Sequence, residues 1–575
     1  MNIKLTGLSI LSGLLLGLAW PETGGFTFLI FIGFLPLLYV EHIVSLQSKR
    51  YTSLLLFCYA YLSFLIFNTF TTWWIWYSSE GGVIMAEVLY SLFMATIFLW
   101  FHAAKKQLGN KRGYIALVVF WIGFEWVHYN WEFSHPWNTL GNAFANQPKI
   151  IQWYEYTGVL GGSFWVLLVN LLFFYFLLKL INGNIPLTNG FPKNKKHFGC
   201  GITQTNHLFS RKSVKFEYKL RNEIKIIIVT IAVILTPIIY SFITYNNYIE
   251  TENPIEIVIV QPNIDPYVEK FGGLTEEEQI TKILELASKK VTSKTAYLVA
   301  PETAIPRAFV ENYPEESYGL QAINRWISNF KNLTFVIGAS TYIEYPKSDH
   351  KPTPTVRYDR QTGGWYDAYN SALQLNNRTK MQIYHKSKLV LGVEKIPYPT
   401  LFSPLESFAI NLGGTIGSLG VEKEAFNFIN DSIRIAPVIC YESIYGEYFS
   451  TYVKKGAQAV FIITNDGWWD DSPGYKQHLA YARLRAIETR RSIARSANTG
   501  ISCFINQRGD IIQQSTWWKS EALKGTINLN NKQTFYTQSG DWIGRVFAAL
   551  AVLLLAWSWG TKLASPTPPK EGLVS

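Results

Sequence analysis

Three residues of the sequence have the chemistry of a nucleophilic site. Cys440 ends the short apolar run 433–440, Glu302 follows the run 296–300, and Lys386 lies between them along the chain. A thiol becomes a good nucleophile when a base removes its proton or when a nearby cation favours the thiolate. Glu302 could be that base, and Lys386 could favour the thiolate and stabilise an oxyanion.

Each of these residues also has a more ordinary explanation when it is taken alone. A cysteine at the end of an apolar strand is commonly a buried structural residue. Cys440 could also form a disulfide with Cys503, the other cysteine of the same region. Glu302 could be a capping or ion-pairing carboxylate, and Lys386 a solvated surface residue. The chemical interpretation therefore depends on the three residues acting together.

The chain around these residues has the pattern of one α/β domain, residues 254–540. Short apolar, β-branched runs predict strands at 255–261, 296–300, 335–340, 433–440, 459–464 and 501–506. We expect helices over 276–290 and 475–494, and a hairpin turn over 507–510. Because functional side chains gather at the carboxyl ends of the strands in such sheets, the predicted site lies at one sheet edge.

Eight apolar stretches predict a membrane protein, because a spanning helix needs about 20 mostly apolar residues. They cover residues 5–20, 26–45, 52–70, 83–103, 113–127, 160–181, 224–243 and 542–560. We expect a seven-span membrane domain over 1–245, an eighth span within 541–562 and a tail over 563–575. The alternative for the first stretch is a cleaved signal peptide, but further apolar stretches follow it directly.

The net charge of +11 predicts the orientation of the chain rather than a charged partner. Fifteen Lys and Arg residues lie in the loops after the second, fourth and sixth stretches, and one, Lys149, lies in the alternate loops. Basic loops stay in the cytoplasm, so both termini are expected there and the α/β domain outside. That domain is nearly neutral, with 31 basic and 28 acidic residues, so nucleic acid is not an expected partner.

Aromatic residues crowd two of the loops on the outer side, residues 71–77 and 126–153. One interpretation is the belt of Trp and Tyr found at membrane interfaces. The other is a surface that handles lipid beneath the α/β domain. The sequence leaves both open.

Other classes of function lack their motifs. No His-Glu-x-x-His, paired Cys-x-x-Cys or Walker-type loop occurs, so neither a metal nor a cofactor is predicted. We expect His385 and His478, which lie near the motifs, to be hydrogen-bonding neighbours rather than ligands. A transporter would place ionisable residues along a pathway, for which Glu41, Glu87 and Glu125 are few candidates.

The order Glu, Lys, Cys, each in its own motif, resembles the nitrilase superfamily. With apolar stretches before and after the α/β domain, the whole chain resembles its membrane-bound branch, the apolipoprotein N-acyltransferase family. The segments that carry the resemblance are 260–264, 301–304, 369–372, 384–386, 440–442, 464–468 and 496–501.

The resemblance implies an αββα sandwich on a helical membrane base, and a ping-pong acyl transfer. Glu302 would deprotonate Cys440, which would take an acyl chain from a membrane phospholipid while Lys386 stabilises the oxyanion. The resulting thioester would pass the chain to the N-terminal amine of a diacylated apolipoprotein. Such an enzyme would lie in the inner membrane with its catalytic domain on the periplasmic side. The alternative is a membrane-tethered amidase, in which water resolves the thioester.

The resemblance also implies supporting residues. The family's additional carboxylate corresponds to Glu394, and its support residues beside the nucleophile correspond to Tyr441 and Glu442. The segment 390–394 departs from the family's Val-Pro-Phe-Gly-Glu, and Phe271 is the aromatic nearest to the position where a lid Trp is common. Phe271 and Trp468 are therefore candidates for substrate binding, and Trp468 could equally be a core residue.

Overall fold

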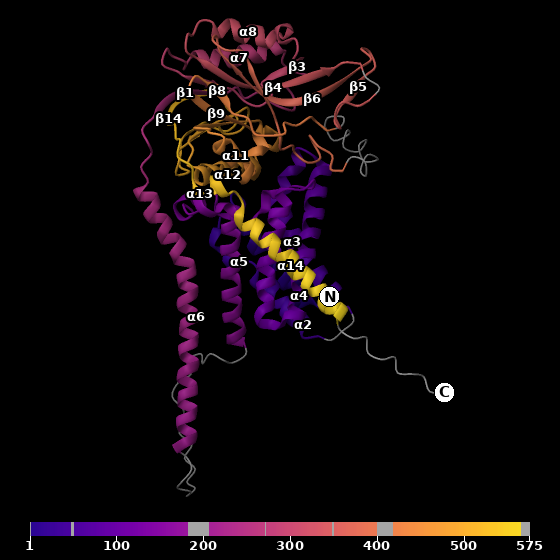
Figure 1. Ribbon diagram of the computed structural model, residues 1–575, viewed down its shortest axis with the longest axis vertical. Coiled ribbons are helices and arrows are strands. Elements are labelled where there is room, and N and C mark those ends of the chain that lie inside the picture. The colour runs from indigo at the N-terminus through magenta and orange to yellow at the C-terminus, as the bar shows by residue number, and fades with distance from the viewer. Residues whose placement is uncertain are drawn as a thin grey trace, which may run out of the picture.

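The computed structural model describes residues 2–47, 51–181, 206–270, 272–347, 350–398 and 418–564. Most of the long helices form one part of the molecule, and two β-sheets packed face to face form the other (Figure 1). The sheets extend from β1 (Pro254–Gln261) to β14 (Glu521–Asn528), so both ends of the predicted α/β domain return to neighbouring strands.

The first sheet has eight strands, in the order β14-β1-β2-β4-β6-β5, with β3 paired to β4 and β7 paired to β6. Strands β1, β2 and β4 run parallel, whereas β14, β6, β5 and β7 add antiparallel pairs around them. The remaining strands of this sheet are β2 (Tyr297–Val299), β3 (Ile305–Val310), β4 (Thr334–Tyr345), β5 (Arg357–Asp359), β6 (Gly364–Leu375) and β7 (Gln382–His385).

The second sheet has six strands in the order β13-β12-β11-β10-β9-β8, and β9, β10 and β11 are parallel. Parallel central strands place the carboxyl ends of β9 and β10 at one edge, where the predicted site residues follow them. The strands are β8 (Phe428–Asn430), β9 (Ile433–Ile439), β10 (Ala459–Thr464), β11 (Ile493–Ala497), β12 (Cys503–Ile505) and β13 (Ile511–Gln514).

Two helix layers complete the predicted αββα sandwich. Helices α7 (Glu276–Ser288) and α8 (Tyr318–Ile327) cover the outer face of the first sheet. Helices α11 (Gly446–Lys454) and α12 (Pro473–Thr489) lie on the other side, between the second sheet and the membrane helices (Figure 1). The nitrilase-like fold class is therefore confirmed, and its α11–α12 layer faces the helical base.

Two predicted boundaries are wrong for local reasons. The expected helix 475–494 ends at Thr489, because Arg490 takes a left-handed φ of 50° and Ile493 begins β11. Strand β9 ends at Ile439, so Cys440 starts the short helix η8 (Cys440–Ile444) rather than ending the strand. The twelve-residue β6 was not predicted, because Asp367, Asn370 and polar neighbours interrupt its apolar pattern.

Five helical segments of the described residues are long and apolar enough to cross a membrane: Thr27–Ser45, Thr52–Tyr77, Glu80–Gly109, Tyr154–Ile181 and Ile224–Asn247. Two shorter apolar helices are Ile3–Leu18 and Trp542–Ser558. In element terms these are α1 (Ile3–Leu18), α2 (Leu35–Ser45), α3 (Thr52–Thr72), α4 (Glu80–Tyr129), α5 (Tyr154–Ile181), α6 (Asn206–Asn247) and α14 (Trp542–Ala564). The eight-span arrangement stays a prediction.

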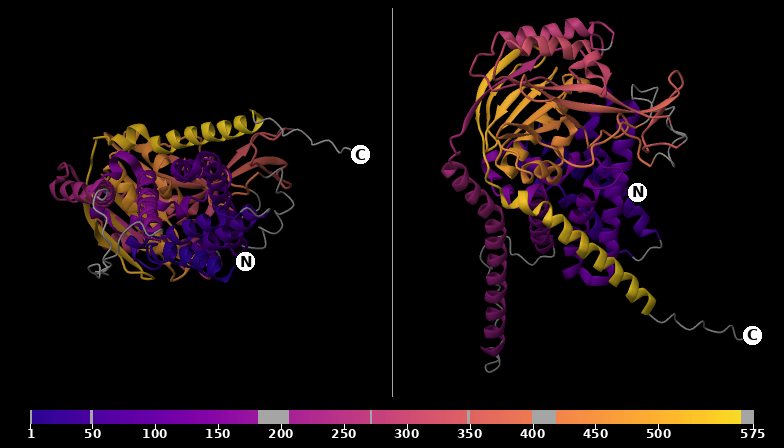
Figure 2. Two further views of the ribbon diagram at one scale, coloured as in Figure 1. Left: turned by 90° about the horizontal axis from the view of Figure 1, so that it is seen from below. Right: turned by 45° about the horizontal axis from the view of Figure 1, so that its top comes forward.

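Helix α4 contains two of the predicted spans, 83–103 and 113–127. They are separated at Gly109, whose φ of 76° and ψ of 167° are not helical. Helix α14 packs along α4 and crosses the bundle obliquely, whereas α6 stands to one side (Figure 2). The close approach of α14 depends on Gly544, where an added Cβ would lie 2.5 Å from the Trp126 ring.

The carboxylates within these helices connect the helices to one another. Glu41 is fully buried. Its Oε1 lies 2.7 Å from His102 Nδ1, and its other oxygen forms an ion pair with Lys105. Glu125 Oε1 accepts hydrogen bonds from Trp121 Nε1 at 3.1 Å and from the Leu140 backbone N–H at 2.9 Å. These ion-pair and hydrogen-bond partners compensate the burial of both carboxylates, so the carboxylates have a structural role in the helical bundle.

The two aromatic loops, residues 71–77 and 126–153, divide into a buried part and an exposed part. Trp74 and Trp137 are each 1 % exposed, and their rings pack against Trp469 of the sandwich at centroid distances of 4.8 and 5.7 Å. Trp137 Nε1 also donates to Gln477 Oε1 of α12 at 2.7 Å. By contrast, Trp76 is 50 % exposed. Part of the expected lipid-facing surface is therefore the joint between the helical base and the sandwich.

Replacing Trp74 by Ala should destabilise the protein by about 3–5 kcal/mol, the usual cost of removing a large buried aromatic side chain. The measurement is the thermal unfolding midpoint of the purified protein in detergent. Trp76→Ala is the matched control, because it removes the same side chain from an exposed position of the same segment. Equal shifts for the two variants would contradict the proposed joint.

Candidate active site

The candidate site lies where loops from both sheets meet. Glu302 follows β2, Lys386 follows β7, and Cys440 follows β9. Thr303 and Cys440 have φ values of 46° and 47°, a left-handed backbone that non-glycine residues adopt at a cost. Each of these residues turns the chain sharply at a strand end, which leaves Glu302 and Cys440 at the sheet edge.

The centre of the site is a buried ammonium held by two carboxylates. Lys386 Nζ lies 3.1 Å from Glu302 Oε1 and 2.9 Å from Glu394 Oε1. Asn370 Nδ2 donates to the same two oxygens at 2.8 and 3.0 Å. The other oxygen of Glu302 accepts the backbone N–H of Asn465 at 3.1 Å. The structure thus brings Glu302, Lys386 and Glu394 together, and it adds Asn370, which lay in a motif but was not predicted as a site residue.

The charges of this cluster determine its resting protonation. Burial opposes the charged form of Lys386, but Glu302 and Glu394 outweigh it and hold the pKa of the ammonium well above its ordinary value. Burial likewise opposes the Glu302 carboxylate, but Lys386 and the Asn370 amide outweigh it and lower its pKa. Burial and the nearby Glu302 charge raise the pKa of the Cys440 thiol. The resting site therefore holds a neutral thiol beside an ionised carboxylate.

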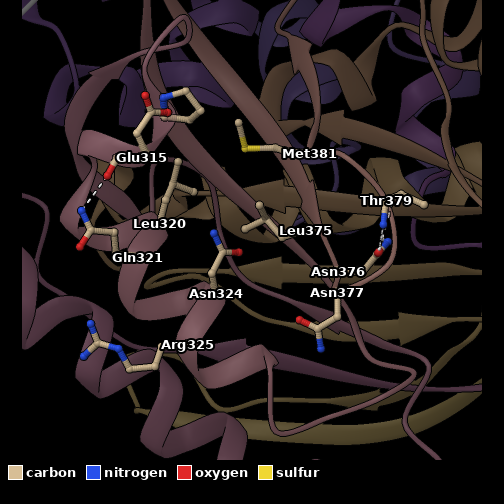
Figure 3. Close-up of a pocket in the computed structure, with 11 residues that line it drawn as sticks. Glu315, Leu320, Gln321, Asn324, Arg325, Leu375, Asn376, Asn377, Thr379 and Met381 are labelled. Carbon is tan, nitrogen blue, oxygen red and sulfur yellow. Dashed lines mark hydrogen bonds between the residues drawn. The ribbon is translucent and has the colours of Figure 1, made fainter.

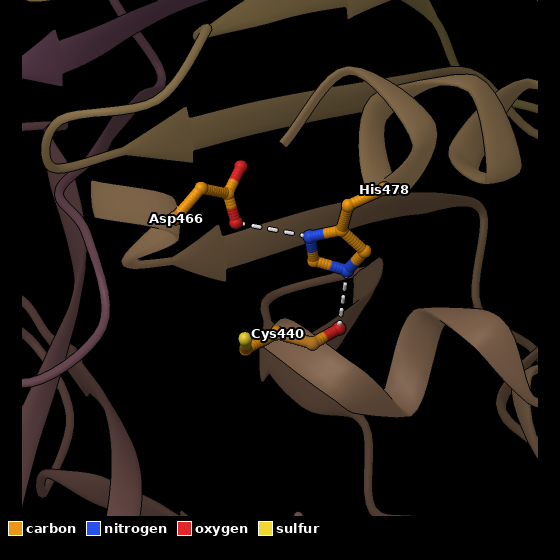
Figure 4. Close-up of side chains that lie close together, drawn as sticks. All are labelled: Cys440, Asp466 and His478. Carbon is orange, nitrogen blue, oxygen red and sulfur yellow. Dashed lines mark hydrogen bonds and ion pairs between the residues drawn. The ribbon is translucent and has the colours of Figure 1, made fainter. Parts of the chain in front are cut away.

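The backbone of Cys440 is held by a second polar network (Figure 4). His478 Nε2 lies 3.1 Å from the Cys440 carbonyl oxygen, and its Nδ1 lies 2.9 Å from Asp466 Oδ1. Ser443 Oγ donates to the same carbonyl at 2.7 Å, and Arg495 forms an ion pair with Asp466. The network holds the nucleophile's main chain, in keeping with the expected hydrogen-bonding role of His478.

The same network contains a set of potential metal ligands, because one ligand atom each of Cys440, Asp466 and His478 lies within 4.8 Å of the others. The Arg495 guanidinium already supplies a positive charge to Asp466. His478 Nε2 is directed at the Cys440 carbonyl (Figure 4). These contacts fit a hydrogen-bonded brace better than a cation site.

Glu442 connects the cysteine loop to the lysine loop. It is fully buried; its Oε2 accepts the Ile439 N–H at 2.9 Å, and its Oε1 accepts the Ser387 N–H at 2.7 Å and the Tyr384 hydroxyl at 2.6 Å. Burial raises the pKa of Glu442 to about 7. This side chain sets the position of Cys440 relative to Lys386.

Three predicted site residues remain: Tyr441, Trp468 and Phe271. The Tyr441 hydroxyl is 3.4 Å from His135 Nδ1 of the helical base. Trp468 is half-buried, and its ring and carbonyl oxygen contact Tyr267. Phe271 lies outside the described residues. The structure has Cys440 and Cys503 as free thiols, so the disulfide alternative is wrong.

Lys270 is a site neighbour that the sequence analysis missed. It is 4 % exposed, forms a hydrogen bond with the Thr303 hydroxyl, and its Nζ lies 3.4 Å from the Glu302 carbonyl oxygen. Burial lowers its pKa to about 8. Its position in the loop after the 260–264 motif was the available signal, since that loop was expected to cover the site.

A cavity of about 580 Å³ lies elsewhere, between α8 and the turn from β6 to β7 (Figure 3). Gln321 Nε2 donates to the Glu315 carbonyl oxygen at 2.6 Å along its wall. Its lining includes none of the predicted catalytic residues. The cavity is therefore no part of the candidate site.

Comparison with known families covers both parts of the chain. Residues 12–172 match the apolipoprotein N-acyltransferase N-terminal domain, and residues 257–536 match the carbon-nitrogen hydrolase family. The chain is 31 % identical to the apolipoprotein N-acyltransferase of Chlorobaculum tepidum, over 95 % of each chain. It is 25 % identical to that of Geobacter metallireducens, over 96 % of this chain and 95 % of the relative.

Solved structures of the nitrilase superfamily cover about half of the chain. A member from Saccharomyces cerevisiae is 16 % identical and covers 48 % of this chain and 90 % of its own, with a TM-score of 0.33. An amidase of Nesterenkonia is 11 % identical and covers 52 % of this chain and 100 % of its own, with a TM-score of 0.35.

His385 provides a test of the electrostatics beside Lys386. Its Nε2 lies 2.7 Å from Glu311 and its Nδ1 3.3 Å from Glu422. Burial alone would lower its pKa, but these carboxylates outweigh it and raise the pKa to about 9. Because the folded protein holds this proton more tightly than the unfolded chain, the contribution is complete below about pH 6.5 and is lost as the pH rises through about 9.

His385→Gln should therefore lower the free energy of unfolding at pH 6 by an amount on the order of 3 kcal/mol, seen as a lower thermal midpoint. The difference from the unmodified protein should vanish by about pH 10. Thermal unfolding in detergent across this pH range is the measurement. A difference that does not change with pH would contradict the ion-pair interpretation.

Proposed function

The chain belongs to the apolipoprotein N-acyltransferase family, and from that premise we propose that Cys440 carries an acyl chain between two lipid substrates. The protein is a membrane-associated acyltransferase that N-acylates lipoproteins. The amidase alternative is not favoured, because relatives named apolipoprotein N-acyltransferase match along nearly the whole chain. The observation that carries the proposal is the buried Lys386 ammonium between Glu302 and Glu394, at the edge where Cys440 follows β9.

In the first half-reaction the acyl donor is a membrane phospholipid. The Glu302 carboxylate takes the thiol proton, and the Cys440 sulfur attacks an ester carbonyl carbon of the lipid. The Lys386 ammonium stabilises the tetrahedral oxyanion. As the intermediate collapses, the carbon–oxygen bond to glycerol breaks, and the leaving oxygen takes the proton back from Glu302. The products are an acyl-thioester on Cys440 and a lysophospholipid.

In the second half-reaction the acceptor is the α-amine of a diacylglyceryl-cysteine at a lipoprotein's N-terminus. Its nitrogen attacks the thioester carbonyl, an amide bond forms, and the carbon–sulfur bond breaks. The amine proton passes through Glu302 to the departing thiolate, which regenerates the neutral thiol. The lowered pKa of Glu302 and the raised pKa of Cys440 support this return to the starting state.

Supporting roles follow from contacts. Glu394 forms a second ion pair with Lys386, and Glu442 keeps the Cys440 and Lys386 loops in register. Tyr441 is buried beside the nucleophile and contacts the helical base, and Trp468 packs on Tyr267. These are positioning and substrate-contact roles rather than steps in the proton transfer.

We assign the catalytic domain, residues 254–540, to the periplasmic side of an inner membrane. The assignment retains the domain limits 1–245, 541–562 and 563–575, eight spans and cytoplasmic termini. The bias of basic residues toward alternate loops supports it. The packing of α12 on the outer-loop Trp137 agrees with a catalytic domain on that face.

Cys440→Ala should abolish acyl transfer from phospholipid to a diacylated lipopeptide, because no thioester can form. Cys440→Ser should do the same while its thermal midpoint stays near that of the unmodified enzyme. Mass spectrometry of the lipopeptide measures transfer, and intact-protein mass should show the acyl adduct on the unmodified enzyme alone. Undiminished transfer by either variant would refute the mechanism.

Two substitutions by Gln test which group deprotonates Cys440. Glu302→Gln keeps the size and shape of the side chain but removes the carboxylate that accepts the thiol proton, so transfer should fall by about 10²-fold or more. His478→Gln disturbs the Cys440 main chain without removing the base, so the loss should be smaller and thioester formation should persist. Single-turnover acylation of Cys440 distinguishes them. A larger loss for His478→Gln would assign the base to the histidine instead.

A further inference from the structure

A second polar pocket lies beside the catalytic cluster, between the helical base and the sandwich. Its volume is about 210 Å³, and its walls include Trp131 and Glu132 from the segment after α4, Lys388 and Lys395 from the lysine loop, and Tyr445. Lys388 is two residues from the proposed oxyanion-stabilising Lys386, and Tyr445 directly follows the helix that Cys440 begins. The pocket therefore adjoins the reaction centre on the side that faces the membrane helices.

The two lysines of the pocket have different partners. Lys388 Nζ lies over the rings of Tyr445 and Tyr448, at 5.2 and 5.3 Å from their centroids. Within the part of the chain that the structure describes, Lys388 forms no ion pair. Lys395 Nζ lies 2.8 Å from Glu132 Oε2, and both side chains of this pair are partly exposed. The nearby Glu442 is occupied by backbone N–H groups, including that of Ser387.

The charges that line the pocket favour a singly charged anion. Among the lining residues, the ammonium groups of Lys388 and Lys395 stand against the one carboxylate of Glu132, so the lining carries one net positive charge. A phosphodiester carries one negative charge and accepts hydrogen bonds from ammonium groups. Two lysines in the lining of a partly enclosed pocket thus have the chemistry of a phosphodiester site.

The size and location indicate the source of the phosphodiester. The pocket is smaller than the roughly 300–1,000 Å³ of sites that enclose whole drug-sized ligands, so it suits a head group rather than an acyl chain. In a glycerophospholipid the phosphate and the acyl ester share one glycerol, so a phosphate bound beside Lys386 leaves the ester within reach of Cys440. We propose that Lys388 and Lys395 bind the phosphodiester of the acyl-donor phospholipid.

This inference rests on the proposed function, and it assigns the pocket a role in the first half-reaction only. The diacylated acceptor carries no phosphate at its lipid-bearing cysteine, so only acylation of Cys440 should depend on the two lysines. The second half-reaction, from the preformed thioester to the lipopeptide, should not. This asymmetry separates a substrate contact from a structural effect.

The test compares Lys388→Gln/Lys395→Gln with the unmodified full-length enzyme in mixed micelles. The donors are phosphatidylglycerol and a diacylglycerol with the same acyl chains, and the readout is the single-turnover rate of Cys440 acylation. Loss of two charge-assisted contacts should lower kcat/KM for the phospholipid about 10- to 100-fold, chiefly through KM. The slow reaction with diacylglycerol and the transfer from preformed thioester should change less than twofold.

Three further variants make the result specific. Lys388→Gln alone leaves the Lys395–Glu132 ion pair intact, and it should give part of the loss if the double variant proves unstable. Glu132→Gln should increase phospholipid use at low donor concentration, because it frees Lys395; a fall like that of the double variant would overturn the inference. Lys455→Gln is the matched control, since it removes an exposed, ion-paired lysine from the same domain.

Inorganic phosphate distinguishes a lipid head group from a free anion. It should slow acylation of the unmodified enzyme in competition with the donor lipid, and it should not affect the double variant. Phosphate that binds without competing with the lipid would overturn the assignment to the donor. Absence of any Cys440 thioester in the unmodified enzyme would refute the proposed function itself, whereas normal acylation with unchanged donor preference in the double variant would refute only the pocket.

Discussion

The buried Lys386 ammonium is the interaction on which the rest of the site depends. Removing a charge from water costs several kcal/mol, and a buried cation is tolerated only with close carboxylates and further hydrogen bonds. Glu302 and Glu394 supply the charges, the Asn370 amide donates to both carboxylates, and the Asn465 N–H donates to Glu302. Four separate segments must therefore converge on one point, which requires both sheets to be complete and correctly packed.

The two sheets contribute different parts of this arrangement. The first sheet provides Glu302 and Lys386 from the ends of β2 and β7 and Asn370 from within β6, and the second provides Cys440 and Asn465 from the ends of β9 and β10. Glu442 joins them, because its carboxylate is bonded to the backbone of both the cysteine and the lysine loops. The sandwich interface is thus also the interface between base and nucleophile, so small shifts between the sheets would misalign the chemistry.

The apolar helices form part of the surroundings of the catalytic site. Trp74 and Trp137 rise from the helical base and pack on Trp469, which adjoins the Asn465–Asp466 segment of the site. Tyr441 and Tyr445, close to the nucleophile, contact His135 and Ser134 of the base. The same loops line the Lys388–Lys395 pocket. The wall of the reaction centre is therefore built partly from membrane-domain residues, as a lipid substrate requires.

Local properties of the sequence were enough to predict an α/β domain, its central strands and the candidates Glu302, Lys386 and Cys440, whereas the αββα sandwich and the supporting residues were predicted from the family resemblance. Hydrophobic runs such as Ala459–Thr464 carry their own strand signal, and Glu302, Lys386 and Cys440 each follow an element with such a signal or lie in a motif. Long apolar helices are readable because the bilayer sets their length. These features depend on residues close together along the chain.

Other features arise only when distant segments meet. Asn370 lies in a strand whose polar residues interrupt the apolar pattern that would predict it. Lys270 becomes a site neighbour through its hydrogen bond to Thr303. The role of His478 depends on Asp466, Arg495 and the Cys440 carbonyl, which three elements bring together. Burial, pKa and the matching of charges are properties of that tertiary arrangement. The sequence by itself determined which chemistry was available, and the packing of the two sheets on the helical base decided which groups could act together, because electrostatic and hydrogen-bond energies depend on distance and exclusion of water.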